Sequence, residues 1–383
     1  MNGFAYDRLR RTPDVEAPNL FAHDATDRML VRRALTLAED DSLTGSDIAV
    51  IGDDYGAITL ALVDADYRGI RVHQDLATGR RALARNAATL GLAGFASHEL
   101  DSTLLAEARL VLLKLPKALA ELEELSDAVA RWAAPEVVLV TGGRVKHMTL
   151  AQNEVLARSF AHVQAERAER KSRLVIASGA QPVPAQPPYP VSSAHPEVGL
   201  TVVAHGGAFA GPRIDIGTRT LLDALAAQPA LEAPTATDWP TVVDLGCGTG
   251  VLAASYALAH PGARLIATDR SAAAVASARA TMVANGLAGR ITVTHDDAGS
   301  ELPEASADIV LLNPPFHLGA SVHTAAATRL FEAAARLLRP GGELWTVYNS
   351  SLAYRGELTR LVGATEQVHR TPKFTVTRSA RRG

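Results

Sequence analysis

Short runs of consecutive apolar residues alternate along this chain with segments whose apolar residues recur at helical spacing. In the first half, the runs 48–51, 110–115 and 137–140 predict strands that are buried on both faces of a sheet. The segment 28–40 predicts a helix, and a further helix is expected to start within 58–63. Strands of this type alternating with helices predict doubly wound α/β domains with a mostly parallel sheet.

The second half repeats this alternation with stronger signals. Its expected strands are 241–245, 264–268, 291–294, 309–312, 343–347 and 374–377, and its expected helices are 217–226, 250–259, 271–285 and 325–338. Ser271 is a suitable N-cap for the third of these helices, and Pro340-Gly341-Gly342 is expected to end the fourth. Ahead of them, 200–204 and 206–209 predict a small hairpin.

Three landmarks recur in the same order in the two halves. A glycine turn follows a strand at Gly52 and at Gly246, and an acidic residue follows each turn at the same spacing, at Asp75 and Asp269. In each half an apolar strand then ends in a loop that contains proline. Because three such matches in register are poorly explained by chance, we infer a tandem duplication.

A proline-rich stretch marks the boundary between the two copies. Five prolines fall within residues 181–190. Proline fixes φ and removes a backbone donor, so this stretch is expected to be extended. We place the linker at residues 181–197 and divide the chain into domains 1–184 and 185–383. The length of 383 residues agrees with two domains.

Composition and charge narrow the class of protein. A hydrophobic content of 47% with 21% charged residues is typical of a globular protein, and the net charge of −3 means that any nucleic-acid surface must be local. The single cysteine, Cys247, excludes a disulfide framework and favours a reducing compartment. Without a signal-like N-terminus or a long apolar run, we expect a cytoplasmic protein that does not bind a membrane. A monomer is also expected, although the sequence itself does not indicate the oligomeric state.

A glycine-rich loop separates the first strand and the helix that follows it in the second half. Its residues are Asp244, Leu245, Gly246, Cys247, Gly248, Thr249 and Gly250. Glycines there let the chain turn sharply and let a ligand approach the backbone, and Asp269 at the end of the next strand can accept hydrogen bonds from a ribose. These residues alone fit a dinucleotide, S-adenosylmethionine or a tight turn without a ligand. The Gly-x-Gly-x-Gly spacing differs from the dinucleotide fingerprint and disfavours a pyrophosphate.

The sequence Asn313-Pro314-Pro315-Phe316, at the end of a buried strand, favours chemistry on an amino group. The exocyclic amine of a base is a poor nucleophile because its lone pair is conjugated with the ring. The amide oxygen of Asn313 and the carbonyl of Pro314 can accept both amine hydrogens and so direct the lone pair toward an electrophile. Pro314 and Pro315 stiffen the loop, and Phe316 offers a face on which the base can stack. The alternative is a rigid turn with Phe316 in the core.

The glycine loop together with residues 313–316 resembles the adenosylmethionine-dependent amino-group methyltransferases. Further stretches narrow this likeness: 209–219, 313–317, and 341–344 followed by Tyr354 and Lys373-Phe374. With them the chain resembles the ribosomal RNA guanine-N2 methyltransferases of the small- and large-subunit type. Those enzymes are tandem duplications with an inactive N-terminal copy. The likeness covers nearly the whole chain and is strongest from about Phe209 to Phe374.

The resemblance implies a cofactor, S-adenosylmethionine, and a role for each motif residue. The residues implied to hold the methionine end are Asp244, Gly246, Cys247, Gly248 and Gly250. Asp269 would hold the ribose, and Asp297 with the backbone of Ala298 would meet the adenine. Thr249 departs from the family, which commonly has Asn there, and we expect this change to be tolerated because the backbone of the loop does most of the binding.

The N-terminal copy lacks the corresponding chemistry. Lys114 stands where Asn313 would be, Lys117 replaces Phe316, and residues 53–55 place two carboxylates and a tyrosine in the glycine turn. Basic residues remain that could contact RNA: Arg144, Lys146 and His147, then Arg167, Arg170, Lys171 and Arg173, and near the C-terminus Arg370, Lys373, Arg378, Arg381 and Arg382. We therefore expect the N-terminal domain to recruit ribosomal RNA or a ribosomal subunit.

The remaining polar residues give less information about function. Cys247 is interpreted as a small apolar filler rather than a nucleophile, and His317 has either a packing role or a contact with RNA. No Cys or His cluster has metal-ligand spacing, so no metal is expected. Transfer of a methyl group to guanine N2 of ribosomal RNA is the expected function. The alternatives are an enzyme that methylates a protein glutamine or a DNA adenine, and a non-catalytic RNA-binding or assembly protein.

Overall fold

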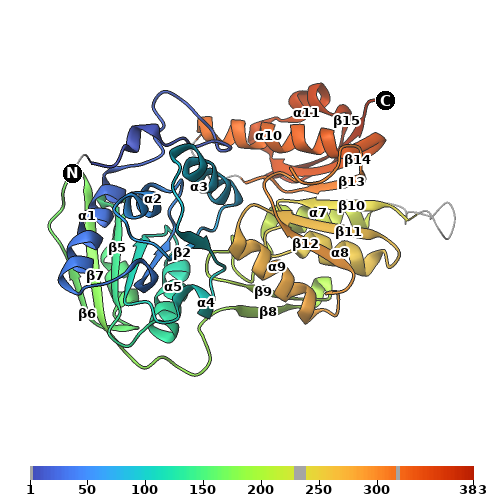
Figure 1. The fold of residues 1–383 in the computed structure, drawn as a ribbon. Helices are drawn as coiled ribbons and strands as arrows, with labels where there is room; N and C mark the ends of the chain where they lie inside the picture. The colour runs from blue at the N-terminus through green and yellow to red at the C-terminus, as the bar shows by residue number, and fades with distance from the viewer. Residues whose placement is uncertain (1–2, 228–238, 316–319) are drawn as a thin grey trace. The chain divides into compact units, whose positions relative to one another are not determined.

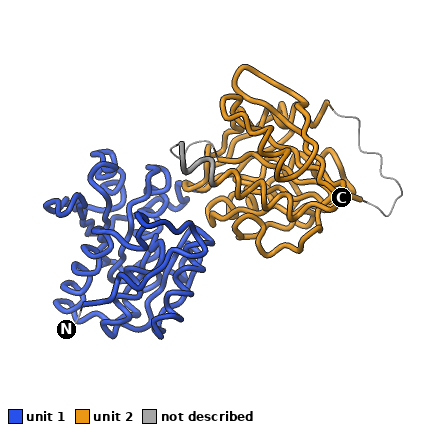
Figure 2. Tube along the Cα trace, turned by 90° about the horizontal axis from the view of Figure 1, so that it is seen from above, with its two compact units in different colours: residues 1–189 blue, residues 190–383 orange. Residues whose placement is uncertain are grey.

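A computed structural model of the chain describes residues 3–227, 239–315 and 320–383, with side chains from 326 onward in the last range (Figure 1). The chain forms two compact units, residues 1–189 and 190–383, which Figure 2 distinguishes by colour. Each unit is built around one large sheet and is described separately below.

The first unit contains a seven-stranded sheet in the order β3-β2-β1-β4-β5-β7-β6. Its strands are β1 Ile48–Ile51, β2 Ile70–His73, β3 Phe95–Ser97, β4 Leu110–Lys114, β5 Val138–Arg144, β6 Phe160–Ala165 and β7 Ser172–Ala180. The strands from β3 to β5 pair in parallel, and β7 pairs antiparallel with both β5 and β6. The mostly parallel sheet predicted from the apolar runs is therefore confirmed.

Helices cover both faces of this sheet. They are α1 Ala25–Asp40, α2 Ala57–Asp64, α3 Ala77–Leu90, α4 Ser102–Leu105, α5 Leu119–Trp132 and α6 Leu150–Leu156. Alternate residues of β1 point to opposite faces: Ile48 and Val50 pack in the cluster that contains α1, α2 and α3, whereas Ala49 and Ile51 pack in the cluster that contains α4, α5 and α6. Burial on both sides explains why the strand is apolar at every position.

The second unit repeats the same strand order as β12-β11-β10-β13-β14-β16-β15. Its strands are β10 Thr241–Leu245, β11 Arg264–Asp269, β12 Ile291–His295, β13 Ala307–Leu312, β14 Leu338–Asn349, β15 Gly363–Arg370 and β16 Phe374–Arg381. Its helices are α7 Ile216–Ala226, α8 Val251–Ala259, α9 Ala272–Ala284, α10 Ala320–Leu337 and α11 Arg355–Leu361. Position for position the two sheets match, which confirms two tandem doubly wound α/β domains.

Two local predictions ahead of this sheet are wrong. β9 (Leu200–Ala204) pairs with β8 (Val191–His195), not with 206–209, which form turns. The linker expected to reach 197 therefore ends earlier, because β8 and a short 3-10 helix, Pro196–Val198, occupy its last part. β9 is held from its other side by α9, where the Asn285 side chain accepts from Thr201 N at 2.9 Å and donates to Thr201 O at 2.7 Å.

The end of α10 also differs from the prediction. The helix stops at Leu337, and Pro340-Gly341-Gly342 lie inside β14 rather than in a turn after the helix. β14 pairs with β13 at Leu338 and again from Glu343 onward, so these residues bulge from the ladder at the position between the two pairings. Gly341 takes a φ of 78°, which suits glycine at such a bulge.

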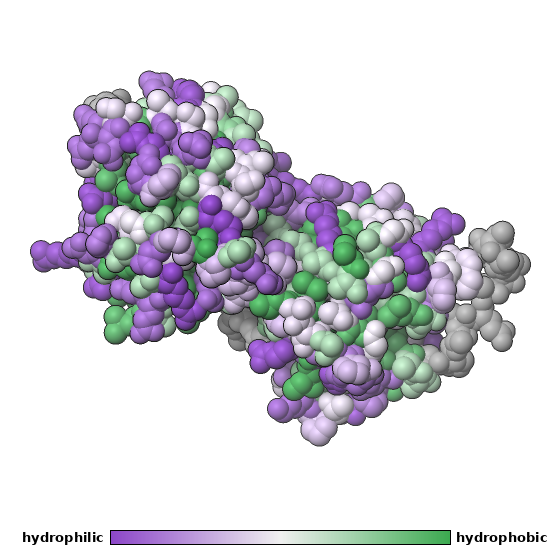
Figure 3. Space-filling model, turned by 90° about the horizontal axis from the view of Figure 1, so that it is seen from below, coloured by the Kyte–Doolittle hydropathy of each residue, from purple (hydrophilic) through white to green (hydrophobic). Residues whose placement is uncertain are grey.

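On the face drawn in Figure 3, hydrophobic and hydrophilic residues are interspersed over both units. Such a mixture is usual, because apolar atoms make up roughly half of a folded protein's accessible surface. Over the described ranges, no helix has the length and apolar character that a membrane crossing requires.

Candidate active site

The second unit has a cavity of about 390 Å³ at the carboxyl ends of its parallel strands. Its lining combines the loop after β10, the end of β11, the loop after β12 and the loop after β13. The predicted residues Gly246, Asp269, Asp297 and Asn313 all line it. Ligands in open α/β sheets bind at this edge, so the fold brings together four motifs that lie far apart in the sequence.

The glycines of the loop after β10 have different tasks. Gly246 and Gly248 have φ values of 77° and 55°, and a Cβ added to either would meet open space. Gly250, in contrast, does not line the cavity, and a Cβ there would lie 2.6 Å from the side chain of Met282 and 3.1 Å from that of Ala278. The first two glycines therefore leave room for a ligand, and the third allows α8 to pack against α9.

Asp244 lies beneath this loop, one residue before β10 ends, and is 1% exposed. Its Oδ2 accepts a hydrogen bond from Ala253 N at 3.0 Å, whereas Oδ1 is buried without a hydrogen-bond partner in the described part of the chain. Burial, reinforced by the negative charge of Asp269, raises the pKa of Asp244 to about 7. A buried carboxylate of this kind favours a cation or hydrogen-bond donor bound nearby.

Cys247 lines the cavity and is also buried. Burial raises the pKa of its thiol well above the ordinary value, and the charges of Asp269 and Asp244 add to the effect. The thiol is therefore neutral at physiological pH, which favours a packing role over a nucleophilic one. No group of three His, Cys, Asp or Glu side chains arranged to hold a metal ion occurs among the described residues.

Asp269 ends β11, and Asp297 lies in the loop after the neighbouring strand β12. The carboxylate of Asp269 accepts hydrogen bonds from Gly248 N and Ser271 N, each at 2.9 Å, which fixes it at the rim of the glycine loop. Asp297 forms an ion pair with Arg329 of α10, a cavity residue that sequence reasoning missed. Ala298 has a φ of 53°, in the left-handed region, so the backbone turns sharply beside Asp297.

Asn313 follows β13 and is held in one orientation. Its Nδ2 donates to Asp215 Oδ2 at 3.2 Å and to Thr218 Oγ1 at 2.9 Å. Its Oδ1 is buried and has no hydrogen-bond partner in the part of the chain that the structure describes. Pro314 is buried and Pro315 is exposed, and both line the cavity.

Two predictions made at this loop lie outside the described residues, namely Phe316 and His317. Sequence reasoning also missed Asp215 and Thr218, which lie at the start of α7. Their signal in the sequence was weak: Asp is a common N-cap at the start of a helix, and nothing local indicated that Asp215 and Thr218 would contact Asn313.

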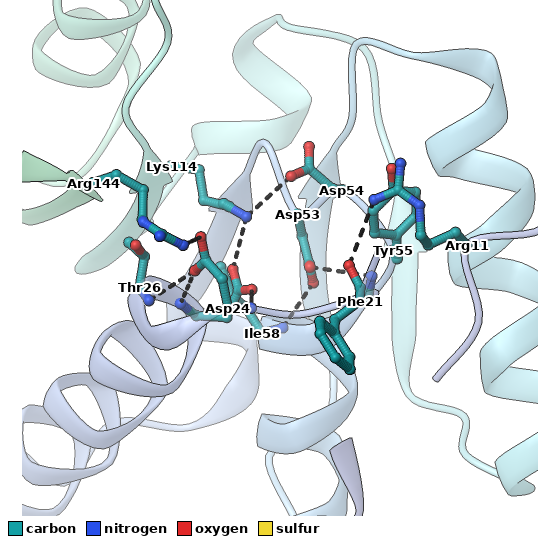
Figure 4. Close-up of polar contacts among 12 residues, drawn as sticks. Arg11, Phe21, Asp24, Thr26, Asp53, Asp54, Tyr55, Ile58, Lys114 and Arg144 are labelled. Carbon is teal, nitrogen blue, oxygen red and sulfur yellow. Dashed lines mark hydrogen bonds and ion pairs between the residues drawn. The ribbon is translucent and has the colours of Figure 1, made fainter. Parts of the chain in front are cut away.

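The equivalent strand end in the first unit is filled by the chain itself (Figure 4). Lys114, at the end of β4, places Nζ 3.0 Å from Asp27 Oδ1 of α1 and 3.0 Å from Asp54 Oδ2 in the turn after β1. The buried Asp53 accepts from Ile58 N at 3.1 Å and from Thr59 N at 2.7 Å, so its carboxylate satisfies the start of α2. An ammonium group donates hydrogen bonds but cannot accept one, so Lys114 cannot replace Asn313 chemically.

The segment before α1 packs on the same turn. The hydroxyl of Tyr55 donates to Asp14 Oδ2 at 2.8 Å, and the guanidinium of Arg11 lies 4.7 Å from the centre of the Tyr55 ring. Arg144 lies 3.8 Å from Asp24 on the other side of Lys114 in Figure 4. The turn after β1 retains the shape of its counterpart, since Gly52 N donates to His73 O at 2.9 Å as Gly246 N donates to Thr268 O at 2.8 Å. The backbone of the duplicated site is preserved and its polar contents are replaced.

Comparison with known proteins identifies the family to which the chain belongs. The RLMG N-terminal domain matches residues 2–181, and the Methyltransferase small domain matches residues 199–378. Ribosomal RNA large subunit methyltransferase G of Streptomyces coelicolor is 35% identical over 384 residues, which covers 97% of each chain. The protein of that name from Ectopseudomonas mendocina is 34% identical and covers 99% of this chain and 98% of its own. The chain belongs to the ribosomal RNA large subunit methyltransferase G family.

Membership in the ribosomal RNA large subunit methyltransferase G family confirms the family resemblance seen in the sequence. A solved structure supports the fold over both units: a T. thermophilus 16S rRNA N2 methyltransferase, RsmC, determined with AdoMet and guanosine, has a TM-score of 0.76. It is 22% identical and covers 99% of both chains. The arrangement of two tandem Rossmann-like units is therefore shared along the full length of the two proteins.

Proposed function

We propose that this protein transfers a methyl group from S-adenosylmethionine to the exocyclic N2 of a guanine in ribosomal RNA. The observation that carries the proposal is the Asn313 amide, whose oxygen is buried at the cavity and has no partner among the described residues. Relatives that match this protein over nearly its whole length bear the name ribosomal RNA large subunit methyltransferase G. RsmC, which shares the fold, is a 16S rRNA N2 methyltransferase whose structure was determined with AdoMet and guanosine.

The cavity suits the cofactor in size and in chemistry. Its volume of about 390 Å³ lies within the usual range of small-molecule sites, roughly 300–1,000 Å³. The open space at Gly246 and Gly248 would accept the cofactor. Asp244 does not line the cavity but lies beneath this loop, and its Oδ1 has no hydrogen-bond partner in the described part of the chain, so its charge would favour the cationic methionine end above it. The residues that would hold the cofactor are Asp244, Gly246, Cys247 and Gly248 for the methionine end, Asp269 for the ribose, and Asp297 with Ala298 for the adenine. Gly250, which the sequence also suggested, does not line the cavity and would act only by letting α8 pack against α9. When bound, S-adenosylmethionine supplies an electrophilic methyl group on a sulfonium.

The residues of the loop after β13 would prepare the amine for attack. Asn313 Oδ1 would accept one hydrogen of the guanine N2 amine, and the carbonyl of Pro314 would accept the other. The lone pair of the amine would then leave conjugation with the ring and point toward the methyl group. Phe316 would stack on the base. Loss of the amine proton to water after transfer requires no strong base, so no histidine is assigned to this step.

Asn313→Ala in the full-length protein tests the proposal. We expect methyl transfer to ribosomal RNA to fall roughly 100- to 1000-fold, because a positioned polar group at the reacting centre is lost. Cofactor affinity, measured by calorimetry, should stay within a factor of about two, since the side chain faces the amine and not the sulfonium. Near-normal turnover in this variant would contradict the proposal.

Chemical mapping of methylated nucleotides defines the substrate. Ribosomal RNA from cells that lack the gene should lose one N2-methylguanine and regain it when purified protein and labelled S-adenosylmethionine are added. Label on a protein glutamine or on DNA adenine would favour the other methyltransferase reading. A protein that binds ribosomal RNA but does not bind S-adenosylmethionine would favour the non-catalytic one.

We further propose that the first unit, taken as residues 1–184 in the sequence division, recruits the RNA. Two basic clusters that are separate in the sequence lie side by side, because β5 pairs with β7 at Gly143 and Arg173, and Val145 N donates to Lys171 O at 3.0 Å. We call their exposed members the hairpin basic surface: Arg144, Lys146, His147, Arg167, Arg170 and Lys171.

The charges around the hairpin basic surface leave it positive. The two acids that interrupt it, Glu166 and Glu169, form ion pairs with Arg33 and Arg32 of α1. Within the described residues no carboxylate lies within 4.0 Å of Lys146, Arg167, Arg170 or Lys171. Cations without a protein partner are available to phosphates of RNA. The C-terminal cluster offers fewer, since Arg378 pairs with Glu366 and Glu343, and Arg382 donates to Thr359 O.

A further inference from the structure

The Asn313 amide has both of its donors engaged, and its acceptor has no partner among the described residues. Nδ2 donates to Asp215 Oδ2 at 3.2 Å and to Thr218 Oγ1 at 2.9 Å, whereas Oδ1 is buried with no hydrogen-bond partner in the described part of the chain. A buried polar atom without a partner is costly, and Asn313 lines the cavity, so its amide oxygen suits a ligand group that donates a hydrogen bond there.

The two partners determine which end of the amide faces them. The Thr218 hydroxyl donates its only hydrogen to Asp215 Oδ2, so toward Asn313 it can only accept. Asp215 is a carboxylate and also only accepts. If the amide turned over, its oxygen would lie against two acceptors and would be repelled by the negative charge. The pair therefore keeps the NH₂ group toward Asp215 and Thr218 and the oxygen away from these two acceptors.

The start of α7 holds this pair in place. Asp215 is the N-cap of α7 and accepts from Gly217 N at 2.8 Å and Thr218 N at 3.3 Å, so its carboxylate is fixed by the helix. Gly217 leaves the space that the amide needs, since a Cβ there would lie 3.3 Å from Asn313 Oδ1 and 3.0 Å from Asp215 Oδ1. The orientation of the amide is thus built by an element about 95 residues earlier in the chain.

We infer that Asp215 and Thr218 are positioning residues that hold the Asn313 amide so that the site accepts a ligand edge bearing an exocyclic amine. The inference rests on the proposed function and adds to it a source of selectivity. A free acceptor at this position favours guanosine, whose 2-amine donates. It does not favour inosine, which is the same nucleoside with a hydrogen in place of that amine. Asp215 and Thr218 act on the reaction only through Asn313.

Three substitutions on one helix separate this role from simple stability. Thr218→Val has nearly the same shape and removes the hydroxyl that accepts from Asn313, whereas Thr218→Ser keeps it. Thr220→Val is the matched control, because Thr220 is similarly buried on α7 but its hydroxyl donates to Ile216 O within the helix. We expect Thr218→Val to lower kcat about ten-fold with little change in KM for S-adenosylmethionine, and Thr218→Ser and Thr220→Val to stay near wild type.

A double-mutant cycle tests whether Thr218 acts through Asn313. In the Asn313→Ala background, Thr218→Val should cause no further loss, because the group that it positions is absent. Equal losses in both backgrounds would overturn the inference, and so would full activity of Thr218→Val. Asp215→Asn gives a second variant that keeps the N-cap, since asparagine also caps helices. It should lower kcat in the same way, because its amide can turn and allow Asn313 to turn with it.

Binding of nucleosides supplies a readout that needs no methyl transfer. With S-adenosylhomocysteine present, calorimetry on the full-length wild type should show guanosine binding about ten-fold more tightly than inosine, and Thr218→Val should reduce this ratio toward one. Equal binding of the two nucleosides by the wild type would refute the inference. If the wild type prefers guanosine in this way but does not methylate ribosomal RNA, the proposed function fails and the inference about the amide survives.

Discussion

At the scale of single residues, the two copies differ most at the end of the fourth strand of each sheet. Asn313 in the second unit presents an acceptor with no partner among the described residues, and Lys114 in the first presents a donor that two carboxylates satisfy. Amine recognition requires an acceptor, so this one difference determines which copy can position an amine. The duplicated backbone remains in both copies, and in the function that we propose this side chain decides which copy can position the amine.

The two equivalent aspartates test which copy binds the cofactor. We predict that Asp269→Ala weakens binding of S-adenosylmethionine at least ten-fold, because charge-assisted hydrogen bonds of roughly 1.5–3 kcal/mol each would be lost. Part of the loss comes from the loop, since the carboxylate also accepts from Gly248 N and Ser271 N. Asp75→Ala is the matched control and should leave affinity unchanged. Calorimetry that finds equal losses for the two variants would contradict the assignment of one active copy.

At the scale of elements, local patterns predicted the central strands well. Ile48–Ile51 and Thr241–Leu245 were predicted with the bounds that the structure has, because strands buried on both faces are apolar throughout and end at glycine turns. β15 was missed, since it lies at the edge of the sheet and pairs only with β16. Its sequence, with Thr365, Glu366 and Gln367 in succession, has no apolar run to reveal it.

The candidate site was likewise predictable where contiguous residues carry a signal, and not where the site depends on contacts between distant residues. The glycine loop and the Asn313 loop are contiguous motifs, so their chemistry could be recognised before the fold was known. The contacts of Asn313 with Asp215 and Thr218 span 98 and 95 positions of the chain, and the pairing of Asp297 with Arg329 depends on how α10 packs. No local pattern encodes contacts of that kind. They follow from the order of the strands together with the way α7 and α10 pack against the sheet.

The ion pair between α1 and β4 is an element-scale contact that can be tested. Lys114→Met keeps an apolar stem of similar length but leaves Asp27, which is 1% exposed, without its ammonium partner. Breaking a buried pair by removing one partner costs about 3–5 kcal/mol of the free energy of unfolding. We expect a loss of this order in urea denaturation, and we expect Asp27→Asn to restore much of it, since the second change removes the stranded charge.

The same variant should change the pH dependence of stability. Burial raises the pKa of Asp27 to about 6, and Lys114 opposes that rise. A carboxyl whose pKa is higher in the folded state loses stability as pH increases from its unfolded pKa, about 3.9, through its folded pKa. Without Lys114 the folded pKa rises further, so the deficit of Lys114→Met should be larger at pH 8 than at pH 5. Equal deficits at the two pH values would show that the charge of Asp27 is not responsible.

At the scale of the whole molecule, the function that we propose gives the two duplicated units different tasks: the first unit binds RNA, and the second transfers the methyl group. The first unit keeps the seven-stranded sheet and its order of strands while the contents of its former site have become a network of internal ion pairs. Such a unit contributes through its surface. On the hairpin basic surface, Lys146, Arg167, Arg170 and Lys171 have no carboxylate within 4.0 Å among the described residues, and phosphates of RNA are anions that would satisfy them.

Charge reversal on the hairpin basic surface tests this division in the full-length protein. We predict that Lys146→Glu and Lys171→Glu weaken binding of ribosomal RNA fragments and raise KM for RNA, while kcat and the affinity for S-adenosylmethionine stay close to wild type. Arg85→Glu, an equal change of charge at an exposed position of α3, is the matched control and should have little effect.

Binding of ribosomal RNA fragments measured over a range of salt concentrations gives the sharper readout. Each lost phosphate contact should reduce the slope of log K against log salt by roughly 0.7–0.9, so the difference from wild type should narrow as salt rises. A slope that is unchanged in both variants, or reduced equally in Arg85→Glu, would contradict recruitment through this surface.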